Sequence, residues 1–166
     1  MLVGLRTQAY FRKVAEDALA SAGVFEPPVP ITKIIESLGI PILPVNLPRF
    51  FTAATVNIDG LPAMVVNYAQ PESARREAFA HMLSHLLLLL DDPTNVFPRD
   101  SGEHSDADTL AHELTMPSTM VIDQSRLWFN DFRYLARLFG VGEAAMLERM
   151  RELGIVSNQQ GIRWDY

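Results

Sequence analysis

Hydrophobic and polar positions along the chain predict a helical start, a central group of strands and a helical second half. Apolar residues at every third or fourth position indicate amphipathic helices, and short runs rich in β-branched residues indicate strands. Asp59-Gly60 is a hairpin signal between two of these runs, and two prolines confine the first run to a sheet edge. The predicted helices cover about 4–22, 31–38, 71–90 and 105–115, with two or three short helices in 124–156, and the predicted strands cover 40–45, 52–58 and 63–67.

The helix predicted over 71–90 carries two histidines on an almost wholly apolar surface. It reads AFAHMLSHLLLLL from Ala78, so we expect it to be buried on most sides. His81 and His85 are one turn apart and point the same way, as the first two ligands of a zinc ion do. From spacing alone, it is equally possible that the two histidines are hydrogen-bonded core residues, because the pattern H-x-x-x-H often occurs by chance. A third ligand would come from the next helix, which offers Asp106, Asp108, His112 and Glu113.

Composition narrows the class of protein. The chain has 166 residues, 48% of them apolar, and a net charge of −6, which suits a globular domain and disfavours a general nucleic-acid binder. It has no cysteine, so any metal site must use His, Asp or Glu. The longest wholly apolar run, Leu86 to Leu90, is far shorter than the roughly 20 residues of a membrane span. No apolar signal core precedes the first charges, and we therefore expect a cytoplasmic protein without a membrane segment.

Four blocks, in order, resemble the ImmA/IrrE family of small zinc metallopeptidases. The first block of that family typically reads R-F-T-x-A-H-E-L-G-H, and this chain reads REAFAHMLSH over 76–85. The second family block, E-x-x-x-F-A-x-E-L-L-M-P, is similar to DADTLAHELTMP over 106–117. The strand ending at 65–67 and the helical segments of 135–154 also look like the family, so the resemblance covers about 30–156.

The resemblance implies an α+β fold and a set of zinc ligands. In that fold a small mixed sheet with a hairpin packs on the long HxxxH helix and a second ligand helix, followed by C-terminal helices similar to a helix-turn-helix. It implies a metallopeptidase-like domain over 1–122 and a helical extension over 123–166. Zinc is the implied cofactor. The residues at the family's ligand positions are His81, His85 and Asp106, whereas His104 and His112 match no ligand position and are expected in solvent or behind the ligands.

The general-base position of the family holds Met82 in this chain. The usual glutamate takes a proton from the metal-bound water, and loss of a general base typically slows a reaction about 10²- to 10⁴-fold. We therefore expect a catalytically impaired protein that acts by binding. The alternative is an active zinc endopeptidase in which Glu77 or Glu113 is the base. Glu77 is also expected as a surface residue paired with Arg75 or Arg76, and Glu113 as a residue that orients a ligand.

The resemblance implies helix-turn-helix transcriptional regulators as protein partners. Relatives act on such repressors in phage, mobile-element and stress-response switches. The C-terminal helices of this chain are themselves candidates for DNA binding, but residues 131–166 carry no net charge. The would-be recognition helix also opens with Glu143, which repels phosphates. We therefore expect these helices to pack on the first domain and not to contact nucleic acid.

Overall fold

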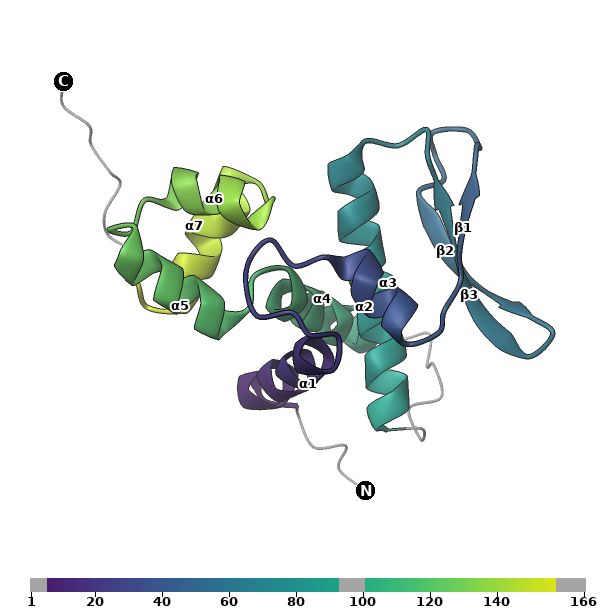
Figure 1. The fold of residues 1–166 in the computed structure, drawn as a ribbon, viewed down its shortest axis with the longest axis horizontal. Coiled ribbons are helices and arrows are strands. Elements are labelled where there is room, and N and C mark those ends of the chain that lie inside the picture. The colour runs from purple at the N-terminus through teal and green to yellow at the C-terminus, as the bar shows by residue number, and fades with distance from the viewer. Residues whose placement is uncertain (1–5, 93–100, 158–166) are drawn as a thin grey trace.

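The computed structural model describes residues 6–92 and 101–157. In these two stretches the chain forms seven helices and one three-stranded sheet, which confirms the α+β class (Figure 1). The elements in chain order are α1 (Gln8–Ser21), α2 (Ile31–Ser37), β1 (Ile42–Val45), β2 (Ala53–Ile58), β3 (Leu61–Asn67), α3 (Glu72–Asp91), α4 (Ser101–Thr115), α5 (Ser118–Leu127), α6 (Phe132–Phe139) and α7 (Glu143–Glu152).

The sheet is small and mixed, as the resemblance implied. Its strand order is β1–β3–β2, with β1 parallel and β2 antiparallel to β3. Asp59 and Gly60 have φ values of 52° and 87° at the β2–β3 turn, which is the left-handed conformation that a two-residue hairpin turn requires. Pro44 lies in β1, which is an edge strand. A proline is tolerated there, because an edge strand pairs on one side only and the N–H that proline lacks can be one that has no partner strand.

The long helix α3 connects the sheet to the other helices. It lies between the sheet and α4 in the molecule (Figure 1). Its apolar residues pack with strand β3 on one side and with α4 and α1 on the other, which fixes the rotation of α3 about its axis. The buried residues of this core include Met64, Val66, Phe79, Leu83, Leu87, Leu110 and Leu114.

Helix α4 begins earlier than the sequence predicted. The prediction placed 91–105 in a loop, but α4 begins at Ser101; residues 93–100 lie outside the described residues. The first turn of α4 is polar in sequence and includes Gly102, so no apolar period marks where the helix starts. His104 therefore belongs to a helix and not to a loop.

The C-terminal helices α5–α7 surround a second apolar core and pack against the first. Met116 and Val121 already belong to this second core, just before the domain boundary predicted after residue 122. Arg76 of α3 donates to the carbonyl of Phe139 at 3.2 Å, and Arg149 of α7 donates to the carbonyl of Met116 at 3.1 Å. The division into domains 1–122 and 123–166 stays a prediction. No helix in the described part of the chain is long and apolar enough to cross a membrane.

Candidate metal centre

Helix α3 presents His81 and His85 side by side. Their one-turn spacing stacks them on one face of the helix, and the buried Leu83 and Leu87 lie on the other side of the helix, in the main core. The two Nε2 atoms are 3.0 Å apart, and the ring centroids are 4.7 Å apart. Both histidines are partly buried, so the pair lies at the floor of an open site.

Helix α4 brings His104 to this pair. Its Nδ1 lies 3.4 Å from Nε2 of His81, and its ring stands 5.3 Å from that of His85, centroid to centroid. Among the described residues, these three histidines are the one group of three or more side chains with donor atoms close enough to hold a metal ion. The sequence interpretation gave His104 no ligand role, because this residue matches no ligand position of the family.

Asp108 lies directly behind His81. Its Oδ1 is 2.8 Å from Nδ1 of His81, and a carboxylate only accepts, so the imidazole donates this hydrogen bond. The proton therefore resides on Nδ1 and the lone pair of Nε2 faces the other two histidines. A carboxylate behind a metal-binding histidine commonly fixes its tautomer and its orientation. The four-residue spacing of His104 and Asp108 is the sequence signal that could have identified this pair.

Asp106 is not brought to the histidines. In an α-helix it projects about 200° around the axis from His104, which is nearly the opposite side. Its Oδ2 accepts a hydrogen bond from Nη1 of Arg6 at 3.0 Å, so the carboxylate holds the N-terminal segment on α4. The proximity of Asp106 to His81 and His85 that the resemblance implied is therefore absent from the described structure.

The surroundings of His85 favour a neutral ring. Burial lowers its pKa, and the neighbouring His81 and His104 lower it further, while Asp108 acts in the opposite direction. A neutral imidazole is the form that binds a metal ion. The pKa of His85 thus leaves this histidine ready to act as a ligand near neutral pH.

The three donor atoms suit a tetrahedral transition-metal ion. Imidazole nitrogens about 2.0–2.1 Å from a tetrahedral zinc ion lie about 3.3 Å from one another. Two of the three separations, 3.0 and 3.4 Å, lie on either side of this value, and all three donor atoms lie within 4.8 Å of one another. His81, His85 and His104 are therefore close enough together to hold such an ion.

A groove of about 540 Å³ lies between α3, α4 and the start of β2, and of the three clustered histidines His81 lines it. Met82 lines it and is also 9% exposed within the main core, so it faces two environments. Glu77 lines it as well and is exposed, whereas Arg75 and Arg76 donate to the carbonyls of Tyr68 and Phe139. The lining residues are Thr52, Ala53, Ala74, Glu77, Ala78, Ala80, His81, Met82, Asp108, Ala111, His112 and Thr115.

Glu113, the second carboxylate considered as a base, lies away from this groove. It is 2% exposed and forms an ion pair with Arg149 of α7, Oε1 to Nη2, at 2.5 Å. It also accepts hydrogen bonds from the hydroxyl and the main-chain N–H of Ser118. These contacts join α4 to α5 and α7. Glu113 therefore holds helices together and orients none of the three histidines directly.

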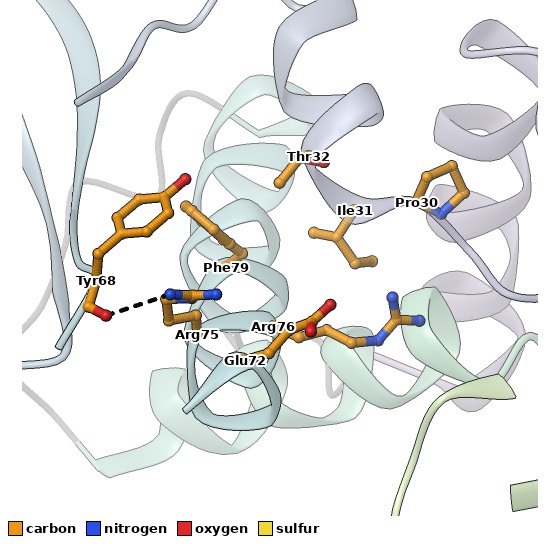
Figure 2. Close-up of a pocket in the computed structure, with 8 residues that line it drawn as sticks. All are labelled: Pro30, Ile31, Thr32, Tyr68, Glu72, Arg75, Arg76 and Phe79. Atoms are coloured by element: carbon orange, nitrogen blue, oxygen red, sulfur yellow. Dashed lines mark hydrogen bonds between the residues drawn. The ribbon is translucent and has the colours of Figure 1, made fainter. Parts of the chain in front are cut away.

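A second pocket, of about 190 Å³, lies on another face of α3 (Figure 2). Arg75 stands over the ring of Tyr68 at 4.4 Å from its centroid, and Arg76 reaches towards α6. Burial lowers the pKa of Arg76, and Glu72 opposes this shift. Both guanidinium groups thus hold elements of the fold together. The lining residues are Pro30, Ile31, Thr32, Tyr68, Glu72, Arg75, Arg76 and Phe79.

Comparison with known proteins identifies the family and supports the fold. No curated protein matches the sequence. Among solved structures, the fold is similar to that of a Mycobacterium tuberculosis transcriptional regulator, with a TM-score of 0.61 and 17% sequence identity. The match covers 85% of this chain but 46% of that one, so this chain spans less than half of the regulator's length. The model of the IrrE N-terminal-like peptidase domain matches residues 35–151, and the chain therefore belongs to this peptidase family.

Proposed function

We propose that this chain is a catalytically impaired member of its peptidase family, which binds a segment of a protein partner in the groove beside α3. The observation that carries the proposal is Met82, which lines the groove next to His81 where the family has its general base. A thioether neither accepts nor donates the proton that hydrolysis requires. The chain would keep a metal at His81 and His85, and such an ion would supply Lewis-acid chemistry, polarising a carbonyl and lowering the pKa of a water molecule.

The free edge of β2 supports binding of an extended segment. Asn67 donates to the carbonyl of Thr52, and hydrogen-bonded pairs alternate along an antiparallel ladder. The main-chain N–H and C=O groups of Ala53 and Thr55 therefore point away from β3. Ala53 lines the same groove as His81, so a segment paired with this edge would pass close to His81. Addition of a strand to an open edge is a recurring mode of peptide recognition.

A transcriptional regulator is the partner we propose. The resemblance of the sequence to proteins that act on helix-turn-helix repressors supports this choice, and so does the similarity of the fold to that of a transcriptional regulator. The acidic Glu77 and Asp108, with no Lys or Arg in the described groove lining, favour a segment that carries basic residues. The cytoplasmic location expected from the sequence stays a prediction.

Cleavage assays on candidate regulators test the impairment. We expect the wild-type protein with added zinc to leave the regulators intact while binding them, and Met82→Glu to gain chelator-sensitive cleavage. The double variant Met82→Glu/His85→Ala is the matched control and should again be inactive. Because Met82 is buried in the main core, the Glu variant is compared with Met82→Gln for folding by circular dichroism. Rapid chelator-sensitive cleavage by the wild type would contradict the proposal.

An active zinc endopeptidase is the second candidate function, and the position of Glu77 favours it. This carboxylate lines the groove one turn before His81. If it is the base, Glu77→Gln should abolish a wild-type activity that Met82→Gln leaves unchanged. If the protein is impaired as proposed, neither variant has an activity to lose.

A further inference from the structure

We propose that His104, and not Asp106, supplies the third metal-ligating side chain, so that this chain holds its cation with three neutral imidazoles. The inference rests on the metal-binding part of the proposed function. It departs from the ligand set that the sequence resemblance implied, and it follows from how α4 is rotated about its axis.

The rotation of α4 is fixed from two sides. Ala107, Leu110 and Leu114 are completely buried and point into the main core. His104 and Asp108, one turn apart, then share the face towards α3, because residues four apart lie on one side of a helix. Asp106 projects about 200° away from His104. Bringing its carboxylate to His81 would require α4 to turn its apolar face out of the core.

Arg6 holds Asp106 in its observed place. The guanidinium donates to Oδ2 at 3.0 Å, and the Arg6 side chain is 18% exposed, so the pair is shielded from solvent in part. Arg6 also lies 4.0 Å from a carboxylate oxygen of Asp92 at the end of α3. Asp106 therefore has a structural task, namely to anchor the segment before α1 on α4.

The donor atoms meet in one place without any movement of the helices. Nε2 of His81 lies 3.0 Å from Nε2 of His85 and 3.4 Å from Nδ1 of His104. Asp108 holds the proton of His81 on the opposite nitrogen, 2.8 Å away. All three ligands are thus imidazoles, two of them binding through Nε2 and one through Nδ1.

Three imidazoles select the class of cation. Nitrogen ligands suit Zn²⁺, Co²⁺, Ni²⁺ and Cu²⁺, whereas Mg²⁺ and Ca²⁺ require carboxylate, carbonyl or water oxygens. Because none of the three ligands is a carboxylate, the ligands do not neutralise the two positive charges of the ion. The nearest negative charge is that of Asp108, which is hydrogen-bonded to His81. We therefore expect Zn²⁺ and Co²⁺ to bind, and Mg²⁺ not to bind, at the histidines.

Metal titration of the full chain separates the two ligand sets. Chelator-treated protein is titrated with Zn²⁺ by calorimetry and with Co²⁺ by visible absorption, and Mg²⁺ serves as the negative probe. We expect His104→Ala to weaken Zn²⁺ binding by more than the ~10- to 100-fold typical of losing a residue behind the ligands. Asp106→Asn, which keeps the side-chain shape, should leave the affinity and the Co²⁺ spectrum unchanged. His85→Ala is the control for the site itself.

The opposite pattern overturns the inference. If Asp106→Asn loses Zn²⁺ and folded His104→Ala retains it, the third ligand is the carboxylate, while the metal-binding part of the proposed function stands. If the wild type binds Zn²⁺ no more tightly than His85→Ala does, both the inference and that part of the proposed function fail. Circular dichroism of each variant establishes that the loss is not one of folding.

Discussion

Glu77 and Glu113 are two carboxylates of similar chemistry to which the fold gives opposite surroundings. Glu77 is exposed at the groove, whereas Glu113 is 2% exposed and pairs with Arg149, itself 5% exposed. Burying a charged side chain lowers the stability of the fold unless an opposite charge or hydrogen bonds compensate for the lost hydration. The burial of Glu113 therefore depends on Arg149, and that of Arg149 depends in part on Glu113. At the scale of single residues, burial and pairing thus separate a structural carboxylate from one available to a ligand.

Neutralising Glu113 should destabilise the protein strongly. Glu113→Gln keeps the shape of the side chain but removes the buried charge partner of Arg149, which then retains its ion pair with the more exposed Glu152 at 3.1 Å. Breaking a buried pair typically costs about 3–5 kcal/mol, and because Glu152 remains we expect a loss towards the lower end of this range. Urea unfolding followed by circular dichroism measures this loss. Glu77→Gln is the matched control, and an exposed substitution of this kind should change the free energy of unfolding by less than ~0.5 kcal/mol. Equal urea midpoints for the two variants would show that the buried pair contributes nothing to stability.

The sequence predicted some members of the site and missed others for physical reasons. His81 and His85 lie four residues apart in one apolar helix, and local periodicity is enough to place them together. Asp106 was predicted as a ligand from its position in the family motif. Which side of α4 faces the histidines depends instead on which residues of α4 enter the core, and the motif does not show this. The bond between Arg6 and Asp106 joins residues 100 positions apart, and no local pattern indicates such a contact.

At the scale of elements, α1 is tied to α3 by a hydrogen bond at the end of the histidine helix. The hydroxyl of Tyr10 donates to Oδ2 of Asp91 at 2.6 Å. Arg6 adds a second link to the same region through Asp92. The strands and the hairpin were predictable from β-branched runs and Asp59-Gly60, whereas the start of α4 was not, because its first turn carries no apolar period.

The tie between α1 and α3 should weaken at alkaline pH. Burial raises the pKa of Tyr10 to about 12 from 10.0, with a further contribution from Asp91. The folded state therefore holds this proton more tightly than the unfolded state, and the stability it contributes is complete below about pH 10 and is lost as the pH rises towards about 12.

Tyr10→Phe should remove this pH dependence. Ultraviolet absorbance of phenolate measures the titration, and the late-titrating component of the wild type should be missing from the variant. The Tyr68→Phe variant is the control, because Tyr68 is exposed and should leave that component in place. An unchanged late component in Tyr10→Phe would assign it to another tyrosine.

For the whole molecule, the C-terminal helices extend the fold and their basic residues are used internally. Over α5–α7 five arginines are balanced by five carboxylates, so this face has no surplus of positive charge. Arg149 is bonded to Glu113, Ser118 and the carbonyl of Met116 in the interior. A helix-turn-helix that binds DNA needs cations free to reach phosphates, and here the most central one is buried.

We expect the 166-residue chain not to bind duplex DNA at physiological ionic strength. Fluorescence anisotropy with a labelled random duplex tests this, and neither Arg149→Gln nor the exposed Arg151→Gln should change the signal. The two variants should differ in stability instead, because Arg149→Gln leaves Glu113 buried without its partner, at a cost of about 3–5 kcal/mol. Salt-dependent submicromolar binding that Arg151→Gln weakens would assign these helices to DNA. The expected result is a loss of stability in Arg149→Gln alone and no DNA binding by any variant. This result would show that Arg149 stabilises the interior of the fold, where it bonds to α4, the helix that carries His104.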